Sequence, residues 1–262
     1  RLHFGYALNK VLNGMVGLSL TAGGWRHREQ EFNLRGALSF LHLIAPLSLI
    51  LLIIPNYTTS SMGSTLTPVQ EGFLGVLCIV VYGLFLLLQT TRHKSFFDHL
   101  HPEIDEEVPP DHASGATDGP WGILRSTAGL VLSVVPIVLL AEHLGGFIDF
   151  GLETLHAPVS LGGLLVAVLV LAPEGLGALR AAVANRVQRA VNICLGSALA
   201  TIGLTVPTVL LAAGLQRHEL LLGLTSVDAI LLYATLISAL ITFLGGRANM
   251  LQGTVHLMLF VA

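Results

Sequence analysis

Residues 159–182 read VSLGGLLVAVLVLAPEGLGALRAA, and this stretch decides the fold. It contains one acidic residue, Glu174, and is long enough to cross the hydrocarbon core of a bilayer as a helix. An ionised carboxylate near the middle of such a segment costs roughly 2.5–3.5 kcal/mol on insertion scales. A residue this costly usually faces a partner, a cavity or an ion path, so Glu174 is the first functional candidate.

The composition indicates a membrane protein. Of 262 residues, 53% are hydrophobic and 11% are charged, whereas a soluble domain carries about 25% charged residues. The net charge of −3 gives no reason to expect a nucleic-acid partner. Cys78 and Cys194 lie in separate apolar stretches, and we interpret them as buried free thiols. The chain begins at Arg1 without Met and ends in an apolar run at Ala262, so we expect a piece of a longer protein.

Apolar windows predict an all-α polytopic membrane protein with about eight spans. Helices rather than barrel strands are expected, because the apolar runs are longer than about 10 residues and do not alternate. The predicted spans are Tyr6–Gly23, Ala37–Ile54, Gly72–Thr90, Trp121–Leu144, Val159–Ala182, Ala190–Ala213, Val227–Leu244 and Asn249–Ala262.

The charges between the spans predict their orientation. The connections Pro55–Glu71 and Gly145–Pro158 contain no Lys or Arg, whereas every second connection is basic and only Arg217 breaks the alternation. Because basic loops stay in the cytoplasm, the basic connections are expected on that side. Their residues are Arg26, Arg28, Arg35, Arg92, Lys94, Arg125, Arg180, Arg186, Arg189 and Arg247.

A long acidic connection divides the chain into three predicted parts. These are residues 1–94 with three spans, a cytoplasmic linker at 95–120, and residues 121–262 with five spans. The linker carries acidic and His residues and is broken by Pro. It is either a cation-attracting regulatory patch or a solvated flexible linker. No metal-ligand spacing is present in it, so a structural zinc site is not expected.

Polar and helix-breaking residues at membrane depth surround Glu174. Pro173 and Gly175 flank it and predict a helix break, whose freed carbonyls could coordinate a cation beside the carboxylate. The next span carries Asn192, Gly196, Ser197 and Thr201 at about one-turn spacing, and Pro207 predicts a second break. These small and hydroxylated residues either bind an ion or pack helices together.

A second group of polar residues is ranked lower. The first span holds Asn13 and Ser19 in a cluster like that of the sixth span, which suggests an internal repeat. Glu142 and His143 close the fourth span as an entry site or as interface residues. We interpret His42 and His256 as core histidines bonded to a neighbour, and Tyr82, Gln89 and Gln252 as helix-packing groups.

Several separated stretches carry a family resemblance. They are GGWRHREQEFN (23–33), YGLFLLLQTTRH (82–93) with the acidic loop after it, APEGLGALRAAVANRVQRAVNICLGSALATIGLTVP (172–207) and GRANMLQG (246–253). In order and spacing the chain resembles the calcium/proton exchanger family of the cation/Ca2+ exchanger superfamily. It is most similar to the bacterial ChaA-type sodium-potassium-calcium/proton antiporters.

The resemblance implies an inverted-repeat cation exchanger fold, in which each five-helix repeat supplies an acid to a midplane site. Glu174 matches the acid of the second repeat, Ser197 lies in the matching Gly-Ser helix start, and Glu142 matches an earlier acidic position. A Gln that many members carry after the Gly-Ser pair is replaced by Ala200 and Thr201 here. The resemblance begins after the first repeat's acidic helix, so that helix is missing from this chain and is expected upstream.

We therefore predict a secondary active cation/proton antiporter, with Ca2+/H+ exchange expected first and Na+ or K+ left open. The predicted ligand of both metal cation and proton is Glu174, together with Pro173, Asn192, Gly196, Ser197 and Thr201. Asn13, Ser19, Glu142 and His143 are secondary. No cofactor is expected, and the partners are the lipid bilayer, inorganic cations and protons.

The expected location is the bacterial inner membrane, with the acidic loop in the cytoplasm. The alternatives are an intramembrane enzyme with Glu174 as general acid or base, and a non-transporting membrane subunit.

Overall fold

A computed structural model describes residues 8–9, 11–58, 66–92, 94–97, 119–156, 159–216 and 223–262. The chain forms two compact units, residues 1–100 with 171–262, and residues 101–170. The described chain is mostly helical, which confirms the prediction of an all-α membrane protein. Residues 98–118, most of the predicted acidic linker, lie outside the described part.

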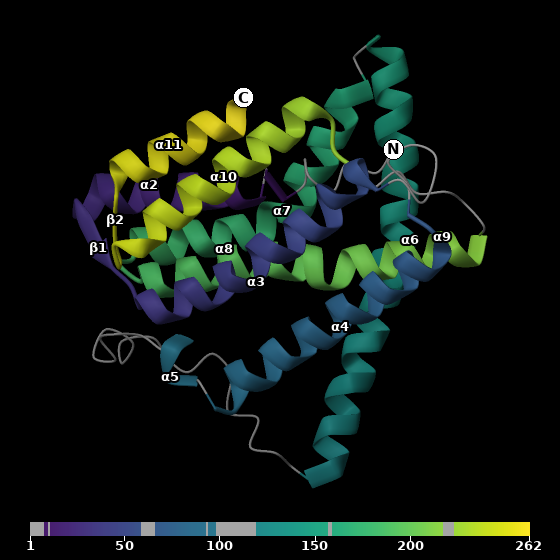
Figure 1. Ribbon diagram of the computed structural model, residues 1–262, viewed down its shortest axis with the longest axis horizontal. Coiled ribbons are helices and arrows are strands. Elements are labelled where there is room, and N and C mark those ends of the chain that lie inside the picture. Colours follow the sequence, from purple (N-terminus) through teal and green to yellow (C-terminus); the bar gives the residue numbers. More distant parts are fainter. Residues whose placement is uncertain are drawn as a thin grey trace. The chain divides into compact units, whose positions relative to one another are not determined.

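Helices make up nearly all of the regular structure (Figure 1). The α-helices are α2 (Val16–His27), α3 (Leu34–Leu52), α4 (Pro68–Thr90), α5 (Lys94–Phe97), α6 (Gly119–Thr154), α7 (Val159–Val183), α8 (Val187–Ala200), α9 (Val206–Gln216), α10 (Ser226–Leu244) and α11 (Met250–Val261). Two π turns, η1 (Val11–Met15) and η4 (Thr201–Thr205), and a 3-10 turn, η2 (Ile54–Tyr57), adjoin them. The strands are β1 (Glu29–Glu31) and β2 (Arg247–Asn249).

The helices fall on the predicted spans. Four stretches of the described chain are long and apolar enough to cross a bilayer: Leu34–Tyr57, Pro68–Thr90, Val187–Ala212 and Ser226–Leu244. The other predicted spans overlap η1–α2, α6, α7 and the shorter apolar helix α11. The end of the fourth span was predicted wrongly, because α6 runs on to Thr154 and includes most of the predicted connection Gly145–Pro158. The chain is therefore a multi-pass membrane protein.

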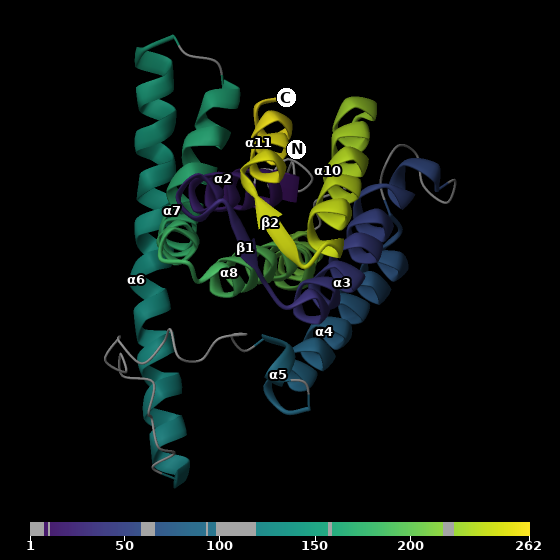
Figure 2. The ribbon, with the colours of Figure 1, turned by 90° about the vertical axis from the view of Figure 1, so that its left-hand side faces the viewer.

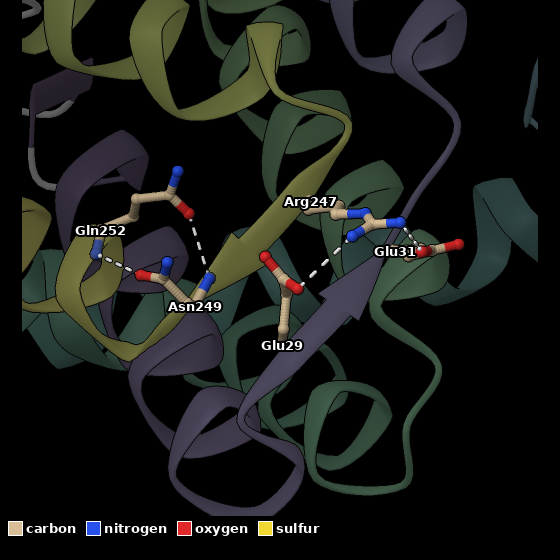
Figure 3. A network of polar contacts seen from close by, with 5 residues as sticks. All are labelled: Glu29, Glu31, Arg247, Asn249 and Gln252. Carbon is tan, nitrogen blue, oxygen red and sulfur yellow. Dashed lines mark hydrogen bonds and ion pairs between the residues drawn. The ribbon is translucent and has the colours of Figure 1, made fainter.

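Two short strands join helices from opposite ends of the chain. β1 and β2 pair antiparallel, with Gln30 opposite Ala248, and they lie side by side in Figure 2. Arg247 lies 3.6 Å from Glu29 and 2.7 Å from Glu31, and dashed lines in Figure 3 mark both ion pairs. Because these side chains are exposed, each ion pair contributes at most about 1 kcal/mol. The backbone pairing therefore holds the start of α11 beside the end of α2.

Capping side chains set where two of the helices begin. The Thr67 hydroxyl accepts from the Gln70 backbone, whose side chain accepts from the Thr67 N–H, and this capping box starts α4. Asn249 and Gln252 form the same reciprocal pair at the start of α11 (Figure 3). Gln252 was predicted to be a helix-packing group, and that prediction is wrong because its side chain satisfies an orphan N–H of the helix start.

The predicted helix breaks are absent. The chain stays α-helical through Pro173 and Gly175 in α7, and Pro207 lies in the first turn of α9, where its missing N–H costs little. Between α8 and α9 the π turn η4 keeps the chain helical. Membrane helices tolerate Pro because neighbouring groups and local π adjustments satisfy the freed carbonyls.

Glycines bring α2 and α11 into backbone contact. A Cβ placed on Gly17 would lie 2.9 Å from the Leu257 backbone nitrogen, which is shorter than real Cβ contacts. A Cβ on Gly253 would come closer still to the backbone nitrogen of Thr21. Small residues let membrane helices approach until their backbones touch, so this pair of helices packs through its glycines.

We expect Gly253→Ala to lower the free energy of unfolding by about 1–3 kcal/mol, because the added methyl group meets backbone that cannot move aside. The measurement is thermal unfolding of the purified protein in detergent. Gly83→Ala is the matched control, since a Cβ at Gly83 of α4 meets nothing within 4 Å. Equal stability of the two variants would contradict the close packing of α2 on α11.

Candidate functional site

The centre of the candidate site is a contact between α7 and α8. The Ser197 hydroxyl donates a short hydrogen bond to Glu174 Oε2. Ser197 is part-buried on α8, and its backbone carbonyl accepts from the Thr201 hydroxyl at 2.9 Å. The contact therefore brings Glu174 of α7 to Ser197 of α8, whereas the Thr201 hydroxyl bonds back one turn along its own helical segment.

Glu174 itself is exposed in this chain, whereas the sequence predicted a buried carboxylate. The difference arises because only Ser197 reaches it among the described side chains, and the neighbouring Pro173 and Leu176 are exposed as well. Exposure here means that no described part of this chain covers the carboxylate. In a bilayer the same face meets lipid or further protein. Within the described residues no Lys or Arg pairs with Glu174.

Two other predicted members of the site serve a different contact. Asn192 donates to the Phe97 carbonyl at 2.7 Å and accepts from Gln188 at 3.0 Å, so its amide ties α8 to α5. Gly196 faces α3, where a Cβ on it would lie 3.8 Å from the Phe40 ring. Asn192 therefore anchors the start of the predicted acidic linker instead of bonding to Glu174.

Asn13 and Ser19, two of the secondary candidates, form other contacts. Asn13 is fully buried and bonds to Asn9, Thr235 and His256. Ser19 is buried on α2 beside Cys194 of α8. His143 is exposed on α6, in the other compact unit, and Glu142 adjoins it with its side chain outside the described part.

Several interpretations of single residues are settled by the packing. Cys78 and Cys194 are free and buried, as predicted. His42 bonds to the Leu38 carbonyl of its own helix but is exposed, whereas His256 is a buried histidine with two side-chain partners. Tyr82 packs on Gly203 of η4, where a Cβ would lie 2.8 Å from the ring. Among the described residues, no three His, Cys, Asp or Glu side chains gather as a metal site.

Sequence reasoning missed the residues that hold the end of α7. Asn185 adopts a positive φ of 61°, and the N–H groups of Asn185 and Arg186 bond back to the carbonyls of Ala182 and Ala181. This arrangement is a Schellman motif, in which Asn is one of the few residues that enter the left-handed region easily. The buried Gln30 of β1 donates to the Ala182 carbonyl and to Asn185 Oδ1, both at 2.9 Å.

His27 adds a second bond to the same helix end. Its Nε2 lies 2.8 Å from the Val183 carbonyl, one residue along from the carbonyl that Gln30 caps. The last turn of α7 is therefore held by α2 and β1, which come from the start of the chain. The only sequence signal was the position of Gln30 and His27 in a basic loop between spans.

Comparison with known protein families now bears on this arrangement. The family model described as "Sodium/calcium exchanger protein" matches residues 4–91 and 125–262, which is most of the chain. The chain belongs to this exchanger family. The predicted resemblance to cation exchangers is confirmed, and so is the prediction of a transporter rather than an intramembrane enzyme.

Individual relatives agree with the family. The chain is 39% identical over 252 residues to y4hA of Sinorhizobium fredii, named for ionic transport, covering 95% of this chain and 66% of the relative. It is 36% identical over 253 residues to the sodium-potassium/proton antiporter ChaA of Escherichia coli, covering 96% and 67%. This exchanger chain thus spans about two thirds of the length of these curated relatives.

A solved structure supports the fold. The structure of native YfkE superposes with a TM-score of 0.71 at 18% identity, over 98% of this chain and 71% of that one. This similarity shows that the chain shares the fold of YfkE.

The Schellman motif gives a test of how α7 is held. Asn185→Ala should destabilise the exchanger by about 1–2 kcal/mol more than Asn185→Gly, because a Cβ is costly in the left-handed region. Both substitutions remove the bond to Gln30. The difference between their free energies of unfolding therefore isolates the cost of placing a Cβ in the left-handed region. Thermal unfolding in detergent measures it. A difference near zero would show that the end of α7 does not depend on this conformation.

Proposed function

We propose that the protein is a secondary active cation/proton antiporter in which a metal cation and a proton compete for the carboxylate of Glu174. The proposal rests on which groups bond to that carboxylate. Glu174 bonds to a hydroxyl group and, within the described chain, pairs with no cationic side chain. Its charge is therefore free to be balanced by a transported ion.

A hydroxyl partner suits a site that alternates between two charge states. Ser197 donates to the ionised carboxylate, and by rotating it can accept from the protonated carboxyl group. An Arg in the same place would hold the carboxylate permanently charged. Alternating access of one site that binds either ion, but not both, produces exchange without ATP.

Ca2+ is the first cation we propose, with Na+ and K+ as the alternatives. Ca2+ takes six to eight oxygen ligands and is usually held by more than one carboxylate. The hydroxyl of Ser197 is the one described side-chain group that bonds to Glu174, and this is too few oxygen ligands for Ca2+. We propose that a second carboxylate, beyond this contact, completes the Ca2+ site.

The relatives leave the choice among these cations open. The Escherichia coli relative is named as a sodium-potassium/proton antiporter, so Na+ and K+ belong in every assay beside Ca2+.

The loop charges support an orientation for this exchanger. We propose that the basic connections, including the one that carries Arg26 and Arg35, lie in the cytoplasm, and that the protein resides in a bacterial inner membrane. The division into residues 1–94, an acidic cytoplasmic linker at 95–120, and 121–262 stays a prediction. In this layout the two parts are the end of a first inverted repeat and a second repeat.

Replacement of Glu174 tests the proposal. In the intact protein in proteoliposomes, Glu174→Gln should abolish the dissipation of a preset pH gradient by added Ca2+, Na+ or K+, because an amide cannot exchange a proton for a cation. Glu153→Gln, at an exposed acid of α6, is the matched control and should keep wild-type flux.

The outcomes separate the candidate functions. Wild-type flux in a well-folded Glu174→Gln protein would remove Glu174 as the shared site. Absence of cation-driven proton flux in the wild-type protein would overturn antiport itself.

A further inference from the structure

Five polar side chains meet in the apolar interior where η1, α10 and α11 pack together. Their exposed fractions run from 0% to 6%, so water does not reach them. In a membrane protein a buried polar group without a partner costs several kcal/mol, so these groups must satisfy one another. We call this group the polar junction, and it consists of Asn9, Asn13, Thr235, Thr242 and His256.

Asn13 is the centre of the polar junction. Its amide nitrogen donates to Thr235 Oγ1 at 2.7 Å and, over a short contact, to Asn9 Oδ1. The Thr235 hydroxyl lies 2.6 Å from the same Asn9 oxygen and donates to it. The Asn13 oxygen is thereby directed at His256 Nδ1, 2.8 Å away.

These partners assign the state of the imidazole. Asn13 Oδ1 can only accept, so His256 Nδ1 carries a proton and donates. Nε2 lies 3.2 Å from the Thr242 hydroxyl, which can donate to it when the ring is neutral. These contacts fit a neutral ring with its proton on Nδ1.

The surroundings of the ring agree with a neutral form. None of the described titratable groups on the neighbouring α2, α10 and β2 bonds to the ring: Arg26, His27, Asp228, Tyr233 and Arg247.

The polar junction is connected to the candidate site through η1. Asn13 is the middle residue of this π turn, and π turns are rare and depend on tertiary contacts. η1 packs on α8, which carries Ser197, and Met15 at its end faces Gly175, where a Cβ would lie 3.8 Å from Met15 Cγ. Gly175 directly follows Glu174, so a shift of η1 reaches both residues of the site.

We infer that His256 is a positioning residue for cation/proton exchange, which holds η1 through Asn13 against the helices that carry Glu174 and Ser197. The inference rests on the function proposed above. In this role α11 shapes the site through Asn13 and η1, without a bond from α11 to Glu174 or Ser197. The role requires a hydrogen-bond donor at the position of Nδ1 and does not require a charge.

Three variants of the intact protein test this role in proteoliposomes. His256→Leu removes the donor, and the half-saturating cation concentration should rise on the order of 10-fold, as when an outer partner of a metal ligand is lost. His256→Asn keeps a donor near the place of Nδ1, and its half-saturation should return to within about twofold of wild type. His42→Leu alters a histidine of α3 whose bond, in the described chain, is to its own helix, and should leave half-saturation unchanged.

Half-saturation separates positioning from folding, because a loss of folded protein lowers the total flux without moving this concentration. Wild-type half-saturation in His256→Leu, or no difference between the Leu and Asn variants, would overturn the positioning role. If His256→Leu yields no folded protein, Thr242→Val takes its place. This variant removes only the partner of Nε2 and should raise half-saturation by a smaller factor.

A second readout does not depend on transport. Nitrogen-15 NMR of labelled histidine should show His256 neutral with its proton on Nδ1, and a proton on Nε2 would contradict the polar junction. If the wild-type protein shows no cation-driven proton flux, the proposed function fails and the positioning role fails with it. If wild-type flux is present and the variants behave alike, only the positioning role fails.

Discussion

The hydrogen bond from Ser197 to Glu174 is the interaction on which this account of the exchanger depends. A carboxylate at membrane depth is expensive unless a partner or a bound ion compensates its charge. A hydroxyl compensates it only in part, so a cation or a proton completes the balance. The two helices that bring the residues together are each held by a bond to a segment from the first half of the chain. Gln30 caps the end of α7, and Asn192 ties α8 to the Phe97 carbonyl.

The same constraint explains why the polar contacts span such long stretches of sequence. Hydrocarbon offers no hydrogen bonds, so a polar side chain between helices finds its partner in another helix or in a carbonyl at a helix end. His256 reaches Asn13 across 243 positions, and Gln30 reaches Ala182 across 152. In both cases a residue from the start of the chain is bonded to one from its second half. The two halves are thereby joined around the helices that hold Glu174 and Ser197.

Local patterns in the sequence were enough to predict the helices, because apolar run length and loop charge depend on the bilayer and not on the partner helix. The sequence proposed Glu174 and Ser197 as members of one site, through the family resemblance, without predicting the hydrogen bond between them. Three features could not be found this way. The helix continues through Pro173 because its neighbours tolerate the lost hydrogen bond, Asn192 turns to a carbonyl of α5, and Glu174 lacks a cover within the described chain. Each depends on packing between segments that no local pattern encodes.

The central claim is that a bound cation displaces a proton from Glu174. Infrared difference spectroscopy of the intact protein in membranes tests it most directly, by comparing spectra before and after cation addition at a pH where the resting site is protonated. The account predicts loss of the carbonyl stretch of a protonated carboxyl group, and no such loss in Glu174→Gln. The same loss in Glu174→Gln, or cation binding to the wild-type protein without any change in this band, would contradict it.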